Sequence, residues 1–260
     1  MATYLDRILA RHRELAASDD RPLHELIERA RVQPPTRGFA EALRTRVGLQ
    51  VISEIKRRSP SKGDLNASLD PAVMARAYER GGAACLSVLT DAEFFGGSVG
   101  DLQAARASCS LPVLRKDFTV SLRDVCDARL MGADCVLLIA AALSPAELRE
   151  MHDLATSLGL DVLVEIHDER ELESALAAEA TLIGVNQRDL VTFQVDHERA
   201  LRMAGVIPSG AVKVAESGVR GREDAAALFA AGYQAVLVGE TLVTSGDPEE
   251  SVRVLRGALP

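Results

Sequence analysis

The feature that most constrains the fold is an alternation that begins near residue 49 and contains eight short, apolar, β-rich runs. Longer segments separate these runs, and in most of them apolar residues recur at helical spacing. Strands that are joined by helical crossovers run parallel, as in βα units, and are not hairpins. The predicted strands are residues 49–55, 84–89, 112–115, 134–139, 161–166, 181–185, 211–215 and 235–238.

An open, doubly wound sheet would show the same local pattern, so the number of units decides between the two folds. Eight units, without a GxGxxG turn after the first strand, favour a closed barrel. Several predicted helices end in glycine, which can close the last turn in a left-handed conformation. The sequence therefore predicts an α/β fold, a (β/α)8 TIM barrel. The predicted helices are residues 71–80, 122–131, 145–158, 169–178, 198–203, 222–231 and 249–255.

Residues 1–45 contain no convincing strand. Apolar residues recur at helical spacing in residues 4–15, 23–30 and 39–43, and the Pro34-Pro35 pair interrupts the pattern. This segment is too short to own a core. We predict that it is a helical extension that covers the catalytic rim, and that residues 1–260 form a single domain with the barrel over about residues 49–260.

Composition excludes several classes of function. A net charge of −8 and a pI near 5.3 argue against non-specific nucleic-acid binding, which needs a surplus of Lys and Arg. The four cysteines form no CxxC and are expected to be reduced, and the five histidines form no HExxH, so no metal site is expected. There is no apolar leader and no stretch of about 18 apolar residues, which predicts a cytoplasmic protein without membrane contact.

Polar residues stand at, or directly after, the ends of six of the eight predicted strands. In a barrel of this kind, the C-terminal strand ends and the loops after them converge on the active site. Each residue alone could be a solvated loop residue or part of a structural ion pair, but charged residues rarely follow buried runs without a partner or a function. The residues in question are Glu54, Lys56, Lys116, Glu165, Asn186, Arg188 and Glu216.

A second group indicates a phosphate site. Ser217-Gly218 and Gly239-Glu240 follow the seventh and eighth strands, where barrels commonly bind phosphate with backbone N–H groups and a short helix. The loop of residues 59–63 after the first strand adds the hydroxyls of Ser59 and Ser61. These residues could also be simple turn residues, but the three loops are neighbours in a closed barrel.

Seven segments along the chain, in order, resemble the indole-3-glycerol-phosphate synthase family. The most specific is VISEIKRRSPSKGDL at residues 51–65, and PVLRKDF and LVEIHDE follow at residues 112–118 and 163–169. The other segments are residues 89–102, 135–143, 183–196 and 214–219. The resemblance implies ring closure of 1-(2-carboxyphenylamino)-1-deoxy-D-ribulose 5-phosphate, followed by loss of CO2 and water, in tryptophan biosynthesis. It implies no cofactor and no metal.

The resemblance also implies roles for the polar residues. Lys116 is the expected proton donor to the carbonyl, and Glu165, with Glu54 beside it, is the expected acid or base. Lys56, Asn186 and Arg188 would hold the carboxylate that leaves. The predicted catalytic residues are Lys116, Glu165, Lys56, Glu54, Asn186 and Glu216. The predicted substrate-binding residues are Arg188, Phe95, Phe118, Leu137 and Ser217, and the predicted phosphate-binding residues are Ser59, Gly218, Gly239 and Glu240.

Two alternatives stay open at this point. One is a related phosphate-binding barrel, such as phosphoribosylanthranilate isomerase or a histidine-pathway sugar isomerase. The first of these would be expected to carry a Cys in its first strand, where this chain has Glu54 and Lys56. An inactive barrel that binds a phosphorylated metabolite would not need the four residues Glu54, Lys56, Lys116 and Glu165. The expected partner is a small phosphorylated substrate, with no nucleic acid and no membrane, and the chain is expected to be a monomer or a weak homo-oligomer.

Overall fold

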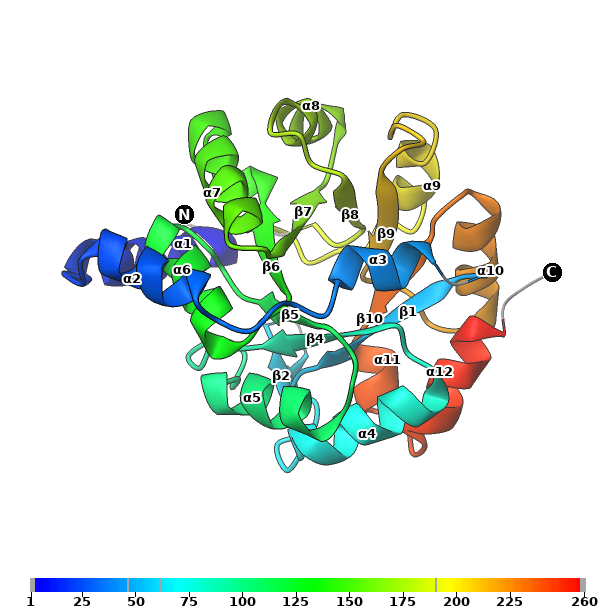
Figure 1. Ribbon diagram of the computed structural model, residues 1–260. Helices are drawn as coiled ribbons and strands as arrows, with labels where there is room; N and C mark the ends of the chain where they lie inside the picture. Colours follow the sequence, from blue (N-terminus) through cyan, green and yellow to red (C-terminus); the bar gives the residue numbers. More distant parts are fainter. Residues whose placement is uncertain (1–2, 46, 61, 190, 258–260) are drawn as a thin grey trace.

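The computed structural model describes residues 3–45, 47–60, 62–189 and 191–257; Ser61, of the predicted phosphate loop, lies outside them, as does residue 190 of the family-like segment 183–196. Eight parallel strands close a barrel in the order β1-β10-β9-β8-β7-β6-β5-β4 (Figure 1). The predicted strands are confirmed to within one residue at each end. They are β1 Gln50–Ile55, β4 Cys85–Leu89, β5 Val113–Lys116, β6 Cys135–Ile139, β7 Asp161–Ile166, β8 Leu182–Asn186, β9 Val212–Glu216 and β10 Ala235–Val238.

Helices surround the barrel, and the seven predicted ones are confirmed with small shifts at their ends. They are α4 Pro71–Gly81, α6 Leu122–Met131, α7 Pro145–Ser157, α8 Glu169–Ala177, α9 Arg199–Met203, α10 Arg222–Ala230 and α12 Pro248–Arg256. The prediction missed helix α5 Val99–Ser108, which buries only Leu102 and Ala105 and so has little periodic apolar signal. It also missed α11 Glu240–Val243, the 3-10 turn Ala140–Ala142, and a hairpin of β2 Arg58–Ser59 and β3 Gly63–Asp64.

The two-residue period of each strand divides the core into two layers. On β7, Val162, Val164 and Ile166 pack in the layer between the strands and the outer helices, whereas Leu163 packs inside the barrel. Glu165 points the same way as Leu163, because it is two residues further along the strand. The strand pattern therefore delivers a carboxylate to the inside of the barrel at its C-terminal end.

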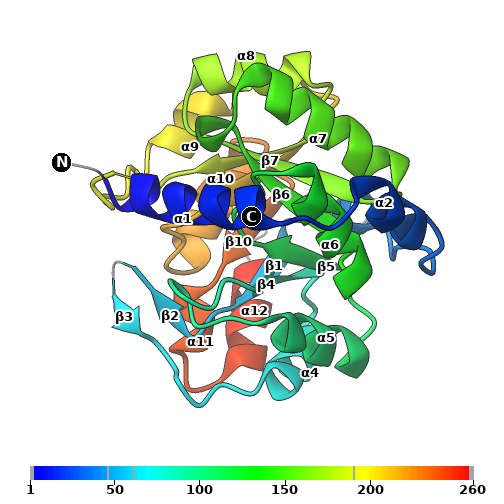
Figure 2. The ribbon, with the colours of Figure 1, turned by 90° about the vertical axis from the view of Figure 1, so that its left-hand side faces the viewer.

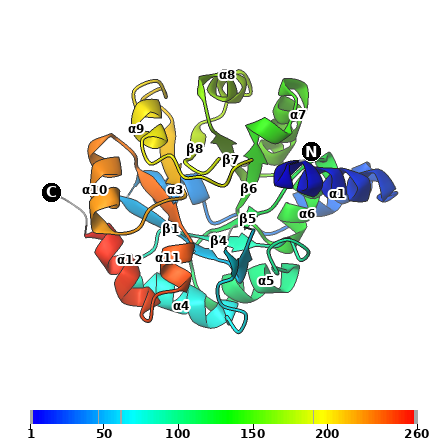
Figure 3. The same ribbon diagram turned by 180° about the vertical axis from the view of Figure 1, so that it is seen from behind.

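The N-terminal extension forms three helices, α1 Tyr4–Ser18, α2 Leu23–Arg31 and α3 Phe39–Arg44. Tyr4, Leu5 and Ile8 of α1 lie at the C-terminal mouth of the barrel, so the predicted cover over the rim is confirmed for this helix. It is wrong for the other two helices. Helix α2 packs against α6, and α3 closes the opposite mouth (Figures 1 and 3).

Helix α3 acts as an apolar plug at the N-terminal mouth. Phe39, Ala40 and Leu43 belong to the cluster inside the barrel. The backbone N–H of Ala40 donates to Asp161 Oδ2 at 2.9 Å, and Asp161 is the first residue of β7. Helix α3 therefore covers the barrel interior at this end, whereas the cavity described below opens at the other mouth.

The state of the cysteines and the character of the helices complete the description of the fold. The four cysteines are free thiols, and Cys85, Cys126 and Cys135 are buried. Among the described residues, none of the helices combines the length and the apolar character that a membrane crossing requires.

Candidate active site

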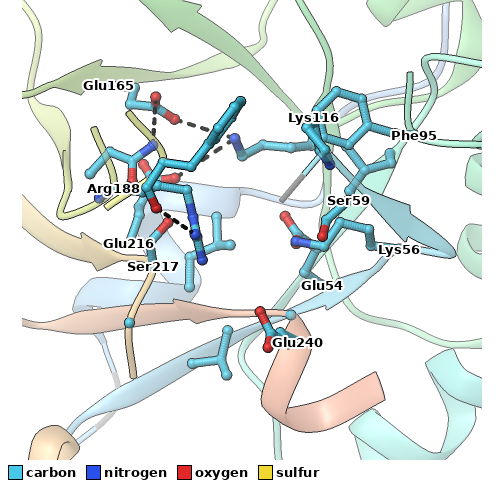
Figure 4. Close-up of a pocket in the computed structure, with 18 of the residues that line it drawn as sticks. Glu54, Lys56, Ser59, Phe95, Lys116, Glu165, Arg188, Glu216, Ser217 and Glu240 are labelled. Carbon is cyan, nitrogen blue, oxygen red and sulfur yellow. Dashed lines mark hydrogen bonds and ion pairs between the residues drawn. The ribbon is translucent and has the colours of Figure 1, made fainter. Parts of the chain in front are cut away.

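A cavity of about 370 Å³ opens at the C-terminal mouth of the barrel (Figure 4). Residues of α1 and of the β2–β3 hairpin line it, and Figure 2 shows these two elements on the same side of the barrel. All of the predicted site residues line the cavity. They are Glu54, Lys56, Ser59, Phe95, Lys116, Phe118, Leu137, Glu165, Asn186, Arg188, Glu216, Ser217, Gly218, Gly239 and Glu240. All eight barrel strands, or the loops directly after them, therefore contribute to one site, as the strand-end pattern predicts.

Lys116 lies at the centre of this site, between carboxylates from three strands. Its Nζ is 3.3 Å from Glu165 Oε2 and 3.9 Å from Glu216 Oε2. Burial lowers the pKa of Lys116, but the negative charges of Glu165, Glu216 and Glu54 outweigh this effect and raise it above its usual value. Lys116 is therefore an ammonium ion at neutral pH. The structural ion pair, which was the alternative interpretation of this residue, is thus present.

Glu165 and Glu216 have pKa values that are shifted in opposite directions. Burial raises the pKa of Glu165, but the charges of Lys116 and His167 and the hydrogen bond from Asn186 lower it by more. Burial and the charge of Glu165 raise the pKa of Glu216 well above its usual value. Two carboxyl groups around one lysine thus favour one ionised form and one protonated form, which is the arrangement that acid–base chemistry needs.

Glycines in neighbouring strands make room for two of these carboxylates. A Cβ atom on Gly184 would lie 2.0 Å from Glu216 Oε1, and a Cβ atom on Gly239 would lie 2.2 Å from Glu54 Oε1. Glu54 in turn pairs with Lys56, with 2.5 Å between Oε1 and Nζ. The two residues are therefore on one face at the end of β1, as their spacing predicts.

Asn186 and Arg188 form a connected pair at the end of β8. Asn186 Nδ2 donates to Glu165 Oε1 at 2.9 Å, and its Oδ1 accepts the backbone N–H of Arg188 at 3.0 Å. The Arg188 guanidinium donates one hydrogen bond, at 3.0 Å, to the carbonyl of Phe193. Asn186 thus uses one donor and one acceptor to orient its neighbours, and most of the N–H donors of Arg188 remain for a ligand.

Two aromatic rings form one wall of the cavity. The ring centroids of Phe95 and Phe118 are 6.2 Å apart. The backbone N–H of Phe95 donates to Asp91 and that of Phe118 donates to Asp117, so both loops are held by carboxylates. Leu137 of β6 adds an apolar surface inside the barrel. An aromatic ligand can pack between these side chains.

The predicted phosphate turns meet at the opposite side of the cavity. Ser217 and Gly218 both have positive φ angles, 64° and 74°, which turns the chain sharply after β9. A Cβ atom on Gly218 would lie 2.5 Å from Val195 Cγ1, so a side chain is excluded there for a local reason as well. Helix α11 begins at Glu240, and Lys62 of the β2–β3 hairpin is 3.5 Å from the Glu240 carboxylate.

The sequence analysis missed the residues that α1 brings to the site. Tyr4 makes edge contacts with Phe94 and Phe193, with centroids 5.8 and 5.4 Å away. His12 Nε2 lies 3.0 Å from Asp91 Oδ2. Isolated aromatic and histidine residues on an amphipathic helix give no signal of which loops they contact, so only the packing could reveal them.

His12, Asp91 and Asp117 form the one group among the described residues whose atoms are close enough to share a metal ion. Asp117 already pairs with Arg115 at 3.1 Å, and Asp91 accepts the backbone N–H groups of two phenylalanines. These bonds explain the cluster without a metal ion: His12 links α1 to Asp91, and both aspartates are held by neighbouring residues at the rim of the barrel.

A family model and sequence relatives both match most of the chain. A family model described as indole-3-glycerol phosphate synthase matches residues 5–255. The chain is 52% identical to indole-3-glycerol phosphate synthase 2 of Streptomyces coelicolor over 233 aligned residues, and the alignment covers 90% of each chain. It is 54% identical to an indole-3-glycerol phosphate synthase of Nocardioides sp. over 210 aligned residues, and this alignment covers 81% of each chain.

Among solved structures, the thiamine phosphate pyrophosphorylase from Pyrococcus furiosus matches with a TM-score of 0.60 and 14% identity, over 81% of this chain and 95% of that one. This similarity concerns the barrel fold alone. The family model and the two relatives carry the assignment of function. The chain therefore belongs to the indole-3-glycerol phosphate synthase family, the decarboxylating lyases of tryptophan biosynthesis.

Proposed function

We propose that the cavity over the barrel binds 1-(2-carboxyphenylamino)-1-deoxy-D-ribulose 5-phosphate and converts it to indole-3-glycerol phosphate, with the residues named above in specific roles. The observation that carries the proposal is the position of Lys116 between Glu165 and Glu216, whose pKa values are shifted in opposite directions. One proton donor and two carboxyl groups of different protonation state match a reaction that both gives and takes protons.

The two ends of the cavity suit the two ends of this substrate. The phosphate would bind at Ser59, Ser217, Gly218 and the Gly239–Glu240 turn, where backbone N–H groups and hydroxyls are available. Lys62 balances the charge of Glu240 in this region. The anthranilate ring would pack against the aromatic wall at the other side.

Lys56 and Arg188 would hold the carboxylate of the anthranilate ring. Both are cations at the rim of the cavity, and Arg188 can offer two parallel N–H groups to a carboxylate. Asn186 supports this arrangement indirectly, because it fixes the backbone of Arg188 and the carboxylate of Glu165. The ring carbon is thereby held next to the carbonyl that it attacks.

The first step forms the carbon–carbon bond of the five-membered ring. As the ring carbon attacks the C2′ carbonyl, the Lys116 ammonium gives its proton to the carbonyl oxygen, which becomes a hydroxyl. The developing alkoxide is a stronger base than an amine, so the raised pKa of Lys116 does not prevent the transfer. The carboxylate then leaves as CO2, and its bonding electron pair restores the aromatic ring.

The second step removes water. The hydroxyl leaves with a proton from an acid, and the adjacent carbon of the new ring loses a proton to a base. Glu216, whose carboxyl group favours the protonated form, is suited to the first task. Glu165, which favours the ionised form, is suited to the second, and Glu54 and Lys56 lie beside them.

The direct test is the assay with the carboxyphenylamino substrate, which follows the fluorescence of indoleglycerol phosphate. We expect turnover by the wild-type chain and its loss in Glu165→Gln. Binding of substrate without any turnover would instead indicate the inactive metabolite-binding barrel. A bound phosphate or product analogue away from the Ser217–Gly218 turn would refute the phosphate assignment.

We also propose that the extension and the barrel form one domain, because Phe39, Ala40 and Leu43 of α3 pack in the same apolar cluster as the residues inside the barrel. A cytoplasmic location and a monomeric or weakly associating state remain predictions. Sedimentation of the purified chain at several concentrations tests the latter.

A further inference from the structure

His167 has no role in the proposed reaction, although it lies directly behind one of its central groups. It follows β7, two residues after Glu165, and its side chain is 12% exposed. It is not among the described residues that line the cavity. The imidazole therefore faces Glu165 from the protein side. Lys116 faces the same carboxylate from the side of the cavity (Figure 4).

Glu171, in the first turn of α8, fixes the orientation of His167. Its Oε2 accepts the backbone N–H of His167 at 2.8 Å and lies 3.0 Å from Nδ1 of the ring. Glu171 is itself held by the cap of α8, where Asp168 accepts its backbone N–H. An ionised carboxylate only accepts hydrogen bonds, so the hydrogen on the ring must sit on Nδ1. The other ring nitrogen is left to face Glu165.

His167 Nε2 is buried without a hydrogen-bond partner, and it lies 3.8 Å from Glu165 Oε1. In the neutral ring this nitrogen would direct a lone pair at an ionised carboxylate, which is repulsive. In the protonated ring it carries a hydrogen and a positive charge, which is attractive. The imidazolium of His167 and the carboxylate of Glu165 therefore stabilise each other.

The charged groups around the ring favour this state. His167 faces Glu165 on β7, Glu171 on α8 and Arg199 on α9. Burial lowers the pKa of His167, but the hydrogen bond of Glu171 and the charges of Glu165 and Glu171 raise it by more, against the opposing charge of Arg199. The Arg199 guanidinium donates a hydrogen bond to the backbone carbonyl of Asn186 at 2.9 Å.

We infer that His167 is a positioning residue that acts through Glu165, and that it keeps this carboxylate ionised after Lys116 has given up its proton. The inference rests on the proposed function. When the Lys116 ammonium becomes an amine, Glu165 loses the cation 3.3 Å away while it remains buried. Burial would then favour uptake of a proton by Glu165. The imidazolium on its other side opposes this uptake, so Glu165 stays free to accept the proton of the new ring.

Two substitutions separate the charge of His167 from its hydrogen bonding. His167→Asn keeps a donor for Glu171 near the position of Nδ1 and removes the group that faces Glu165. His167→Gln places a neutral amide near the position of Nε2. His24, an exposed residue of α2, is the matched control as His24→Asn.

The pH profiles of kcat and kcat/KM are the first readout. Removal of an opposite charge at this distance raises the pKa of a carboxyl group by about one unit or more. We therefore expect the acid limb to move to higher pH by about one unit in both His167 variants and to stay unchanged in His24→Asn. If the His167 variants have a lower melting temperature but an unchanged acid limb, His167 is merely structural and the inference is overturned.

The second readout needs no activity. The imidazole of His167 is titrated by NMR in the wild-type chain and in Glu165→Gln, and its pKa should fall by about one unit or more in the variant. An unchanged titration would also overturn the inference. A wild-type chain without turnover would instead overturn the proposed function, so the two failures are distinguishable.

Discussion

Replacement of Lys116 by methionine tests the central step of the proposed reaction. Methionine keeps an unbranched side chain of similar length but cannot donate a proton. General acid catalysis contributes about 10²- to 10⁴-fold to a rate, or about 3 to 5 kcal/mol of barrier. We expect kcat to fall by at least that factor. KM should change much less, because Lys56, Arg188 and the phosphate turns are not altered.

The same substitution also affects stability, because Lys116 pairs with a buried carboxylate. At the observed 3.3 Å, and with an effective dielectric constant of about 20, the attraction to Glu165 is about 5 kcal/mol. The imidazolium of His167 still faces Glu165 and offsets part of this loss, so we expect the free energy of unfolding to fall by about 3 kcal/mol at neutral pH. The pKa of Glu165 is lower in the folded chain than in the unfolded chain, so its ionised form stabilises the fold at pH values above the unfolded pKa. The difference in unfolding free energy between the wild-type chain and Lys116→Met should therefore shrink as the pH falls through the acid range.

A loss of stability therefore does not distinguish a catalytic lysine from a structural one, and kcat must decide. The measurement is steady-state kinetics, with urea unfolding, on the wild-type chain, Lys116→Met and the double variant Lys116→Met/Glu165→Gln. The double variant removes both charges, so it should regain part of the lost stability while kcat stays low. A destabilised Lys116→Met protein whose kcat is within a few-fold of wild type would refute a proton-donor role.

The remaining predictions concern binding and packing. Arg188→Ala should raise KM about 10- to 100-fold with a smaller effect on kcat in the same assay, because charged hydrogen bonds contribute about 1.5 to 3 kcal/mol to binding of the carboxylate. Gly184→Ala should lower kcat at least about tenfold, because its Cβ atom would lie 2.0 Å from Glu216 Oε1. The control Gly205→Ala, whose Cβ atom would have no atom within 4 Å, should behave as wild type. Equal kcat values in the two variants would contradict the role of Gly184 in making room for Glu216. Tyr4→Ala should raise KM severalfold, because two edge contacts, each contributing about 0.5 to 1.5 kcal/mol, hold α1 over the cavity; an unchanged KM would mean that α1 does not affect binding.

Most of the barrel could be predicted from the sequence, because its strands have two signals that agree. A run such as CVLLI at β6 is fully buried and rich in apolar residues, and a helix with clear caps follows it. Helix α5 shows no comparable signal in the sequence. Its first turn, VGDL, contains a glycine, and few of its residues are buried. The β2–β3 hairpin is only two residues long on each strand, which is below the length at which alternation can be recognised.

The site could be predicted for a different reason: a barrel gathers its strand ends at one mouth, so a linear pattern of polar residues becomes a cluster. The sequence could not indicate which residues pair. That Asn186 is bonded to Glu165, or that Gly184 lies against Glu216, depends on register between strands that are far apart in the sequence. The contribution of α1 and the opposite position of α3 depend likewise on how the extension winds around the barrel.

The positions of α1 and α3 at opposite mouths have a consequence for how the chain folds. The cluster that holds Phe39 and Leu43 also contains Ala235 of β10, the last strand of the barrel. During synthesis the extension emerges first, but the surface that buries it is complete only when the last strand has emerged. Phe39 and Leu43 are therefore exposed for most of translation, and such non-local contacts slow folding. We expect that docking of α3 is a late event that reports closure of the whole barrel, so that incomplete chains expose an apolar segment that chaperones can bind.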